Sequence, residues 1–135
     1  MMLKKREKKG KKGLYRPIIC LSLKKAVLIL LYHLYIDDEF LPELALRKAL
    51  DQISAFHHEL DESGDKIIFV KSLDDMDKAL KENKIGVLLS FEGVEPIVND
   101  INLLRIFYEL GVRGVGLTWS RRNYAADGCS FGRLK

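Results

Sequence analysis

From Asp37 onward, apolar and polar positions follow a regular pattern that predicts helices and strands in turn. Between residues 44 and 60, apolar side chains recur every three or four positions. This spacing predicts a long amphipathic helix with Pro42 in its first turn and an end near Ser63-Gly64. The short run KIIFV at 66–70 is β-branched and predicts a strand. Ser72, with Asp75 three positions later, predicts the cap of a second helix that extends through Leu80.

The second half of the chain continues this alternation. The nearly continuous apolar run IGVLLSF at 85–91 predicts a parallel strand that is covered on both faces. Asn99 or Asp100 is expected to cap the next helix, and Gly111 to end it in a left-handed conformation. The run RGVGLT at 113–118 predicts another strand. Strands that alternate with helices predict right-handed crossovers, so we expect an α/β fold with a parallel sheet.

The first 36 residues depart from this pattern. Residues 1–16 carry a net charge of +7, whereas the whole chain of 135 residues carries +4, which leaves −3 for the remainder. The apolar stretch from Leu14 to Ile36 is interrupted by Lys24 and Lys25. Its longest clean part, 26–32, is about a third of the roughly 20 residues that a spanning helix needs. We therefore expect a basic, apolar head over residues 1–36 and an α/β body over residues 37–135, and we favour a buried apolar segment over membrane attachment.

The composition, 47% hydrophobic and 31% charged residues, is typical of a soluble globular protein. Because the basic excess is confined to the head and the body is mildly acidic, no basic face for nucleic acid is predicted. Cys20 and Cys129 lie far apart, and neither has a partner at metal-ligand spacing. We expect both to be free thiols in a reducing compartment, and the protein to be cytoplasmic.

Functional residues in parallel α/β folds gather at the carboxyl ends of the strands. Two loops follow predicted strands in this way, at residues 92–96 and 119–128. Glu92 is the foremost candidate, because an ionisable side chain directly after six apolar or small residues tends to point inward at the mouth of the sheet. A carboxylate held there needs a cation, a metal or a hydrogen-bond network. The alternative is that Glu92 is a solvated loop residue.

Other polar residues of these loops are weaker candidates. Glu95 lies three positions after Glu92 and beside a proline, and we expect it to be solvated. Arg121 and Arg122 would suit an anionic group, but two adjacent loop arginines are more often simply solvated.

The three histidines do not form a metal motif. His57 and His58 are adjacent on a predicted helix, where they project about 100° apart and do not easily share a metal ion. His33, in the apolar segment, is expected to be a packed or surface side chain. No G-x-S-x-G, G-x-x-x-x-G-K-[ST] or G-x-G-x-x-G pattern occurs, so nucleophile-elbow and nucleotide-binding chemistry lack support.

Four stretches together carry a resemblance to a known family. IGVLLSFEG at 85–93, DINLLRIFYELGVR at 100–113, LTW at 117–119 and NYAADG at 123–128 resemble the membrane (renal) dipeptidase family of zinc metallopeptidases in order and spacing. The resemblance spans about residues 40–135. It implies part of a (β/α)8 TIM barrel with the helices outside, two zinc ions at the carboxyl-terminal rim, and dipeptides as substrates. The carboxylate of the family's EG loop bridges the two metals, and its position is Glu92.

This sequence also departs from the family's pattern. The H-x-D pair that ligates zinc in the family's first strand is absent, and two further histidine ligands would come after the end of this chain. Trp119 stands where characterised mammalian members carry a histidine that stabilises the tetrahedral intermediate. Because a catalytic zinc takes about three protein ligands, we expect an incomplete, inactive fragment of a dipeptidase.

Two other functions remain open at this stage. The first is a non-catalytic, partner-dependent α/β module whose open sheet edges are covered by self-association or by a complementary chain. The second is a protein that the basic head and apolar segment hold on an anionic membrane surface.

Overall fold

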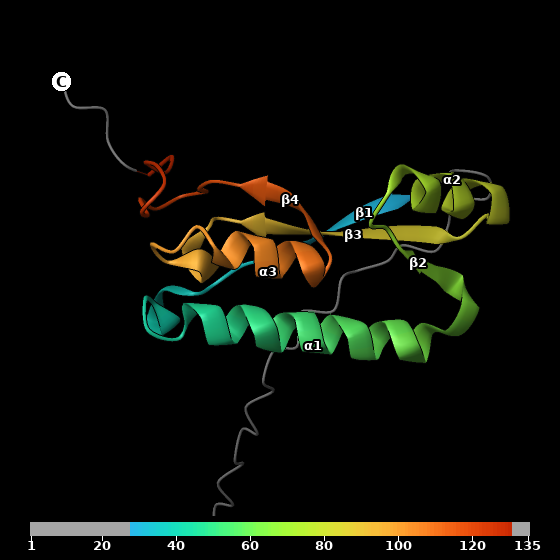
Figure 1. The fold of residues 1–135 in the computed structure, drawn as a ribbon, viewed down its shortest axis with the longest axis horizontal. Coiled ribbons are helices and arrows are strands. Elements are labelled where there is room, and N and C mark those ends of the chain that lie inside the picture. Colours follow the sequence, from blue (N-terminus) through green and yellow to red (C-terminus); the bar gives the residue numbers. More distant parts are fainter. Residues whose placement is uncertain (1–27, 131–135) are drawn as a thin grey trace, which may run out of the picture.

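The structure of the protein is a computed structural model that describes residues 28–130. Within these residues, parallel strands alternate with helices (Figure 1). In chain order the strands and α-helices are β1 Ile29–Leu34, α1 Ala45–Ser63, β2 Ile67–Phe69, α2 Leu73–Glu82, β3 Ile85–Glu92, α3 Leu103–Glu109 and β4 Val112–Gly116. Short 3-10 turns lie at Asp38–Phe40 (η1), Gly64–Lys66 (η2) and Glu95–Ile97 (η3).

β3 is the centre of the sheet, because each of the other three strands of the described chain pairs with it in parallel. β1 lies along one edge of β3, from Ile29 opposite Gly86 to Leu34 opposite Phe91. The other edge is shared: β2 pairs with the first three residues of β3, and β4 pairs with the last four. The side chains on both faces of β3 are buried or half-buried, which agrees with the nearly continuous apolar run that predicted this strand.

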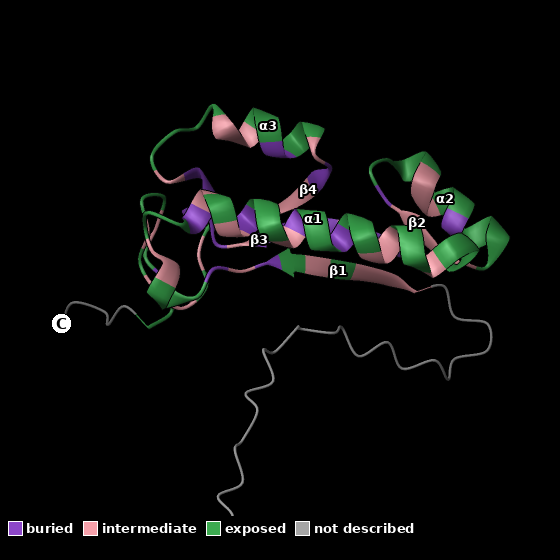
Figure 2. Ribbon diagram, turned by 90° about the horizontal axis from the view of Figure 1, so that it is seen from below, coloured by how far each residue is buried: buried purple, intermediate pink, exposed green. Residues whose placement is uncertain are grey.

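The hydrophobic core lies between the sheet and two helices. Alternate residues of β3, namely Val87, Leu89 and Phe91, belong to the core together with the buried stripe of α1. α3 covers the same face, and its Phe107 ring packs edge-on against Phe91 with 4.9 Å between the ring centroids. Figures 1 and 2 show α1 running along this face of the sheet.

The opposite face of the sheet is less covered. It carries Ser90 and Glu92 of β3, and the register places His33 of β1 beside Ser90 and Leu31 beside Leu88. Leu31 is 58% exposed. α2 contacts this face only near the amino end of β3, where Ala79 lies close to Gly86. The face that would line the interior of a barrel is therefore partly open in this chain.

The helix boundaries follow local sequence signals. α1 ends at Ser63, as predicted, but it begins at Ala45, and Pro42 lies in the turn before it. The reason is that Leu41 is extended, the conformation that a following proline favours, so the chain turns again before the helix starts. The predicted cap of α2 is confirmed, because the Ser72 hydroxyl accepts a hydrogen bond from the Asp75 backbone N–H at 3.2 Å.

β1 is a strand that the sequence pattern did not predict. It comes from within residues 1–36, which we set apart as a basic, apolar head, and it pairs with β3 along its whole length. Residues 1–27 and 131–135, which include Cys20 and the basic run, lie outside the described residues, so the division at residue 36 stays a prediction. Within residues 28–130, no helix is long and apolar enough to cross a membrane.

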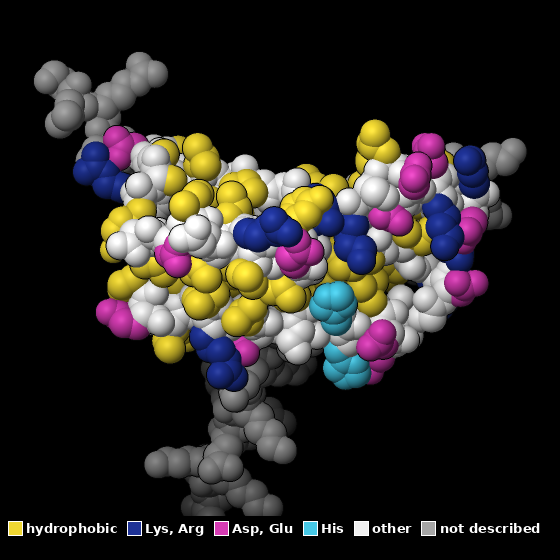
Figure 3. Space-filling view, in the orientation of Figure 1, with side chains coloured by type: hydrophobic (Ala, Val, Ile, Leu, Met, Phe, Trp, Pro, Cys, Tyr) yellow, Lys and Arg dark blue, Asp and Glu magenta, His cyan; other side chains and the backbone are white. Residues whose placement is uncertain are grey.

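Apolar side chains also reach the outer surface of the helical layer. Figure 3 shows hydrophobic side chains gathered over α3 and along its border with α1. Ile101 before α3, Ile106 on α3 and Leu50 on α1 are exposed.

Candidate functional site

The carboxyl ends of β1, β3 and β4 lie at the same end of the sheet, at the left of Figure 1. Three loops meet there: residues 35–44 after β1, residues 93–102 after β3, and residues 117–130 after β4. We call these loops the rim. The rim is the part of the fold at which the sequence predicted functional residues, and a parallel sheet brings its strand ends together in this way.

Glu92 is the last residue of β3 and is half-buried. It lies on the less covered face of the sheet, two positions after Ser90. The Ser90 hydroxyl and His33 Nδ1 form a hydrogen bond of 2.9 Å on that face. The Glu92 carboxylate makes no hydrogen bond or ion pair with any residue between 28 and 130. Both carboxylate oxygens therefore remain available.

Glu95 was expected to be solvated, and the structure shows that this was wrong. Its side chain is only 7% exposed, and its Oε1 accepts a hydrogen bond from Arg121 Nε at 3.0 Å. The carboxylate lies directly over Gly93, where a β-carbon would come within 2.1 Å of Oε2. Gly93 also has φ +103°, which favours glycine. Val94, Pro96 and Ile97 are buried around Glu95, and this apolar context is the sequence signal that was available.

Arg121 was also expected to be solvated, and it instead joins the three loops of the rim. Besides Glu95, its guanidinium donates to the Asp38 carboxylate, to the Ile36 carbonyl, and to the Tyr35 hydroxyl at 3.3 Å. Partial burial opposes the charged form, but the hydrogen bond and charge of Glu95, assisted by Asp38, raise the pKa of Arg121 above its usual range.

The side chain of Asn123 makes three hydrogen bonds that help to fold the loop after β4. The Asn123 side-chain oxygen accepts hydrogen bonds from the Ala125 and Ala126 backbone N–H groups, at 2.9 and 3.2 Å. The Asn123 amide donates to the Leu117 carbonyl at 2.7 Å. Side chains of this kind replace backbone partners in turns, which explains why the run NYAADG folds compactly at the rim. Arg122 is exposed and pairs with the carboxylate of Asp127 in the same loop.

Trp119 lies at the start of the same loop. Its side chain is exposed, and its ring meets the Tyr35 ring edge-on at 5.7 Å between centroids. Its position at the rim agrees with the sequence analysis, and its role in catalysis stays a prediction. His57 and His58 are exposed on α1, and the His57 ring lies edge-on to Phe69 of β2 at 5.6 Å between centroids, outside the three rim loops. Cys129 is a free, exposed thiol, as predicted, and the cytoplasmic location stays a prediction.

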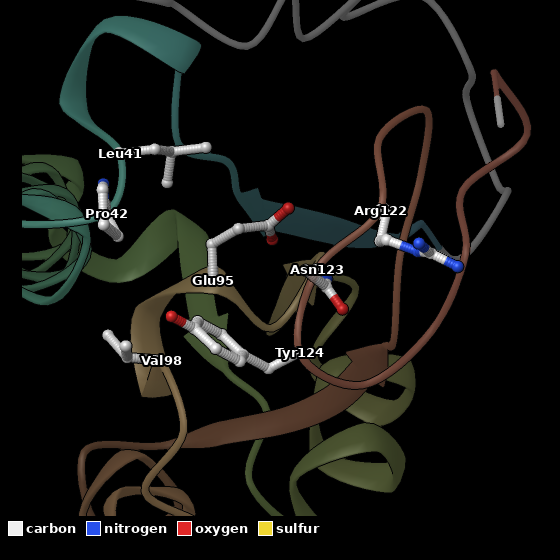
Figure 4. A pocket seen from close by; sticks show the side chains of 7 residues that line it. All are labelled: Leu41, Pro42, Glu95, Val98, Arg122, Asn123 and Tyr124. Atoms are coloured by element: carbon white, nitrogen blue, oxygen red, sulfur yellow. The ribbon is translucent and has the colours of Figure 1, made fainter.

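A pocket of about 420 Å³ lies beside the Arg121–Glu95 pair. Figure 4 shows the Glu95 side chain projecting among side chains from all three rim loops. The lining residues are Leu41, Pro42, Glu95, Val98, Arg122, Asn123 and Tyr124. The walls are therefore mostly apolar, with one carboxylate between them.

The described residues do not fit a complete zinc site. Between residues 28 and 130, no group of three or more histidine, cysteine, aspartate or glutamate side chains lies together. Catalytic zinc requires about three protein ligands. Glu92 is an available carboxylate at the expected place, but nothing else in the described chain completes a coordination shell around it.

The fold and the rim together define a segment of a TIM-barrel-like α/β fold with its site at the carboxyl ends of the strands. A sequence model of the family described as "Membrane dipeptidase (Peptidase family M19)" matches residues 22–134. The chain therefore belongs to the membrane dipeptidase family, which is a family of metallopeptidases. This confirms the resemblance that the strand-end stretches carried.

Comparison with individual relatives gives the extent of the match. The chain is 31% identical over 99 residues to an uncharacterised dipeptidase of Schizosaccharomyces pombe. This match covers 73% of this chain and 24% of that protein. The chain spans about a quarter or less of the length of the curated relatives that it matches.

Solved structures confirm the fold class. The dipeptidase AC of family M19 superposes with a TM-score of 0.64 at 19% identity, over 69% of this chain and 30% of that one. A metallopeptidase of Rhodobacter sphaeroides, liganded with a phosphinate mimic of the dipeptide L-Ala-D-Ala, superposes with a TM-score of 0.57 at 22% identity. The superposition covers 60% of this chain and 23% of that one. The predicted partial barrel is therefore confirmed.

Proposed function

We propose that this chain supplies Glu92 as one ligand of the metal site of a dipeptide-hydrolysing protein, and that the metal is zinc. One observation carries the proposal: a carboxylate at the carboxyl end of the central strand has no hydrogen bond or ion pair within residues 28–130. A cation stabilises the charged form of a half-buried carboxylate in such a place. Membership of a metallopeptidase family supports the metal, and the dipeptide mimic bound to the Rhodobacter relative supports the substrate class.

The same proposal includes inactivity of this chain alone. Glu92 is one ligand, and the described residues hold no cluster that would complete the metal site. We assay the purified chain with L-Ala-D-Ala and added Zn²⁺, and we expect no release of free alanine above the buffer rate. Turnover that is lost on Glu92→Gln would contradict the inactivity and would still support the role of Glu92.

A chimera tests the role of Glu92 directly. Residues 28–130 replace the matching segment of the Schizosaccharomyces pombe dipeptidase, so that the host protein supplies the rest of the barrel. We expect the chimera to retain zinc, measured by metal analysis after dialysis, and Glu92→Gln to lose a large part of it. The matched control is Glu109→Gln, which removes an exposed carboxylate that pairs with Arg105 at the carboxyl end of α3. Equal zinc content in both variants would refute Glu92 as a ligand.

A second candidate function, a partner-dependent non-catalytic module, rests on the open face of the sheet. Leu31 on this face is 58% exposed, and β1 has no strand on its outer edge within the described residues. Unpaired edges and uncovered apolar positions favour association with another chain. Light scattering over a range of concentrations tests this candidate, and a monomer at every concentration would count against self-association.

A further inference from the structure

The pocket beside Glu95 combines apolar walls with a buried carboxylate. Leu41, Pro42 and Val98 provide aliphatic surface, and Tyr124 provides an aromatic face. At about 420 Å³ the pocket lies within the size range of small-molecule sites, which are mostly apolar with a few polar groups that orient the ligand. Glu92 does not line this pocket, so the inference that follows does not depend on the proposed function.

Glu95 has one oxygen satisfied and one not. Oε1 accepts the hydrogen bond from Arg121, whereas Oε2 is buried and has no hydrogen-bond partner among the described residues. A buried carboxylate oxygen without a partner is costly, and native sites of this kind normally have a donor. The pocket is the open space next to this carboxylate, as Figure 4 shows.

The local charge is also unbalanced. Arg121 is shared by two carboxylates, those of Glu95 and Asp38, so this cluster carries a net charge of about −1 when all three groups are ionised. Arg122 borders the pocket as well, but its guanidinium pairs with Asp127, and that pair adds no net charge. One positive charge in the pocket would therefore balance the cluster.

We propose that this pocket binds a small organic ligand through a protonated primary amine, which donates a hydrogen bond to Oε2 of Glu95. The number of free oxygens selects this chemistry. A guanidinium prefers both oxygens of a carboxylate, and Arg121 already occupies Oε1. A Ca²⁺ ion takes six or more oxygen ligands, and the apolar walls do not provide them. A primary ammonium can donate one hydrogen bond to a single such oxygen while water accepts from its other two N–H groups, and an attached alkyl chain would lie against the apolar walls.

Binding requires a small movement of Glu95. In the structure Oε2 faces Gly93, and the terminal torsion of a glutamate side chain has a broad energy profile. Rotation about this bond moves both oxygens together, so Oε2 turns toward the pocket only if the Arg121 guanidinium shifts with Oε1. Because Gly93 has no side chain, nothing at that position obstructs the rotation.

The test is an NMR titration of the full chain, labelled with ¹⁵N, with n-butylammonium chloride as the probe. 1-Butanol serves as the neutral analogue, and sodium chloride at the same ionic strength controls for salt. We expect n-butylammonium to shift the backbone amide signals of Val98, Asn123 and Tyr124 in a saturable way, and 1-butanol to bind at least about tenfold more weakly. Equal binding of the amine and the alcohol, or shifts that sodium chloride reproduces, would overturn the proposal.

Two variants place the binding on Glu95. Glu95→Gln keeps the shape of the side chain and removes its charge, and we expect it to weaken n-butylammonium by about tenfold or more. Glu62→Gln removes an exposed carboxylate at the far end of α1 and is expected to change nothing. If Glu95→Gln loses the dispersed spectrum of a folded protein, Tyr124→Ser is used instead, because Tyr124 is 69% exposed and lines the pocket. Unchanged affinity in the folded variant would overturn the proposal.

Discussion

Replacing Gly93 with alanine tests the arrangement of the rim, because two separate costs fall on that position. Its φ of +103° is unfavourable for a residue with a side chain, which costs about 1–2 kcal/mol. The new β-carbon would lie 2.1 Å from Glu95 Oε2 and 2.9 Å from its Cδ, so the carboxylate must leave its place beside Arg121. Displacing a buried, hydrogen-bonded carboxylate costs about a further 1–3 kcal/mol. We therefore expect Gly93→Ala to lower the free energy of unfolding by about 2–5 kcal/mol.

The assay is urea unfolding followed by far-UV circular dichroism, with Gly64→Ala as the matched control. Gly64 also has positive φ, at +59°, but a β-carbon there would meet nothing within 4 Å. Gly64→Ala therefore measures the backbone cost alone. Repeating Gly93→Ala in a Glu95→Ala background removes the clash and should reduce its cost to that of the control. If Gly93→Ala costs no more than Gly64→Ala, the position assigned to the Glu95 carboxylate is wrong.

Three further predictions concern the rim and α2. Arg121→Met leaves the buried Glu95 carboxylate without its partner, so we expect the free energy of unfolding, measured in urea, to fall by about 3 kcal/mol. Arg122→Met removes one partner of an exposed ion pair and is expected to lower it by less than about 1 kcal/mol. Ser72→Ala removes the α2 cap and is expected to lower the free energy of unfolding by about 1 kcal/mol. The control is Ser54→Ala at an exposed position within α1, which should change it very little. Equal losses of stability in the two variants would contradict the cap. The Ser72 hydroxyl holds the pKa of Asp75 below its usual range, so the stability that Asp75 contributes is present above its unfolded pKa of about 4 and is lost as the pH falls through the lower folded value. Asp75→Asn should therefore destabilise at about pH 6 and cost progressively less as the pH falls below about 4, and a cost independent of pH would refute this.

The elements that the sequence predicted well are those with local signals. The Ser72 cap, the end of α1 at Ser63 and the left-handed Gly111 after α3 each depend on residues within a few positions of one another. β3 was predicted because a strand whose side chains are buried or half-buried on both faces has few polar positions. Glu92 was placed correctly at the carboxyl end of β3 by the rule that strand ends carry function, and its role as a ligand stays a prediction.

The features that were missed depend on contacts between distant parts of the chain. Glu95 and Arg121 lie 26 positions apart, and each is a typical solvated residue when it is considered alone. Only the fold brings the loops after β3 and β4 together, and burial of both side chains follows from that. β1 was missed for a similar reason, because its partner strand, β3, begins more than fifty residues later. In addition, the apolar run that forms β1 follows Lys24 and Lys25 without a turn signal that would mark it as a strand.

The central place of β3 has a consequence for how the protein opens. Because β1, β2 and β4 pair with β3 and not with one another, no pair of strands in the described sheet keeps its hydrogen bonds when β3 leaves. His33 on β1 and Ser90 on β3 are 57 positions apart, so a growing chain exposes β1 until nearly the whole of β3 has been synthesised. The amides of β3 should therefore be the last to exchange with deuterated solvent, and they should do so only when the whole sheet opens as one cooperative unit.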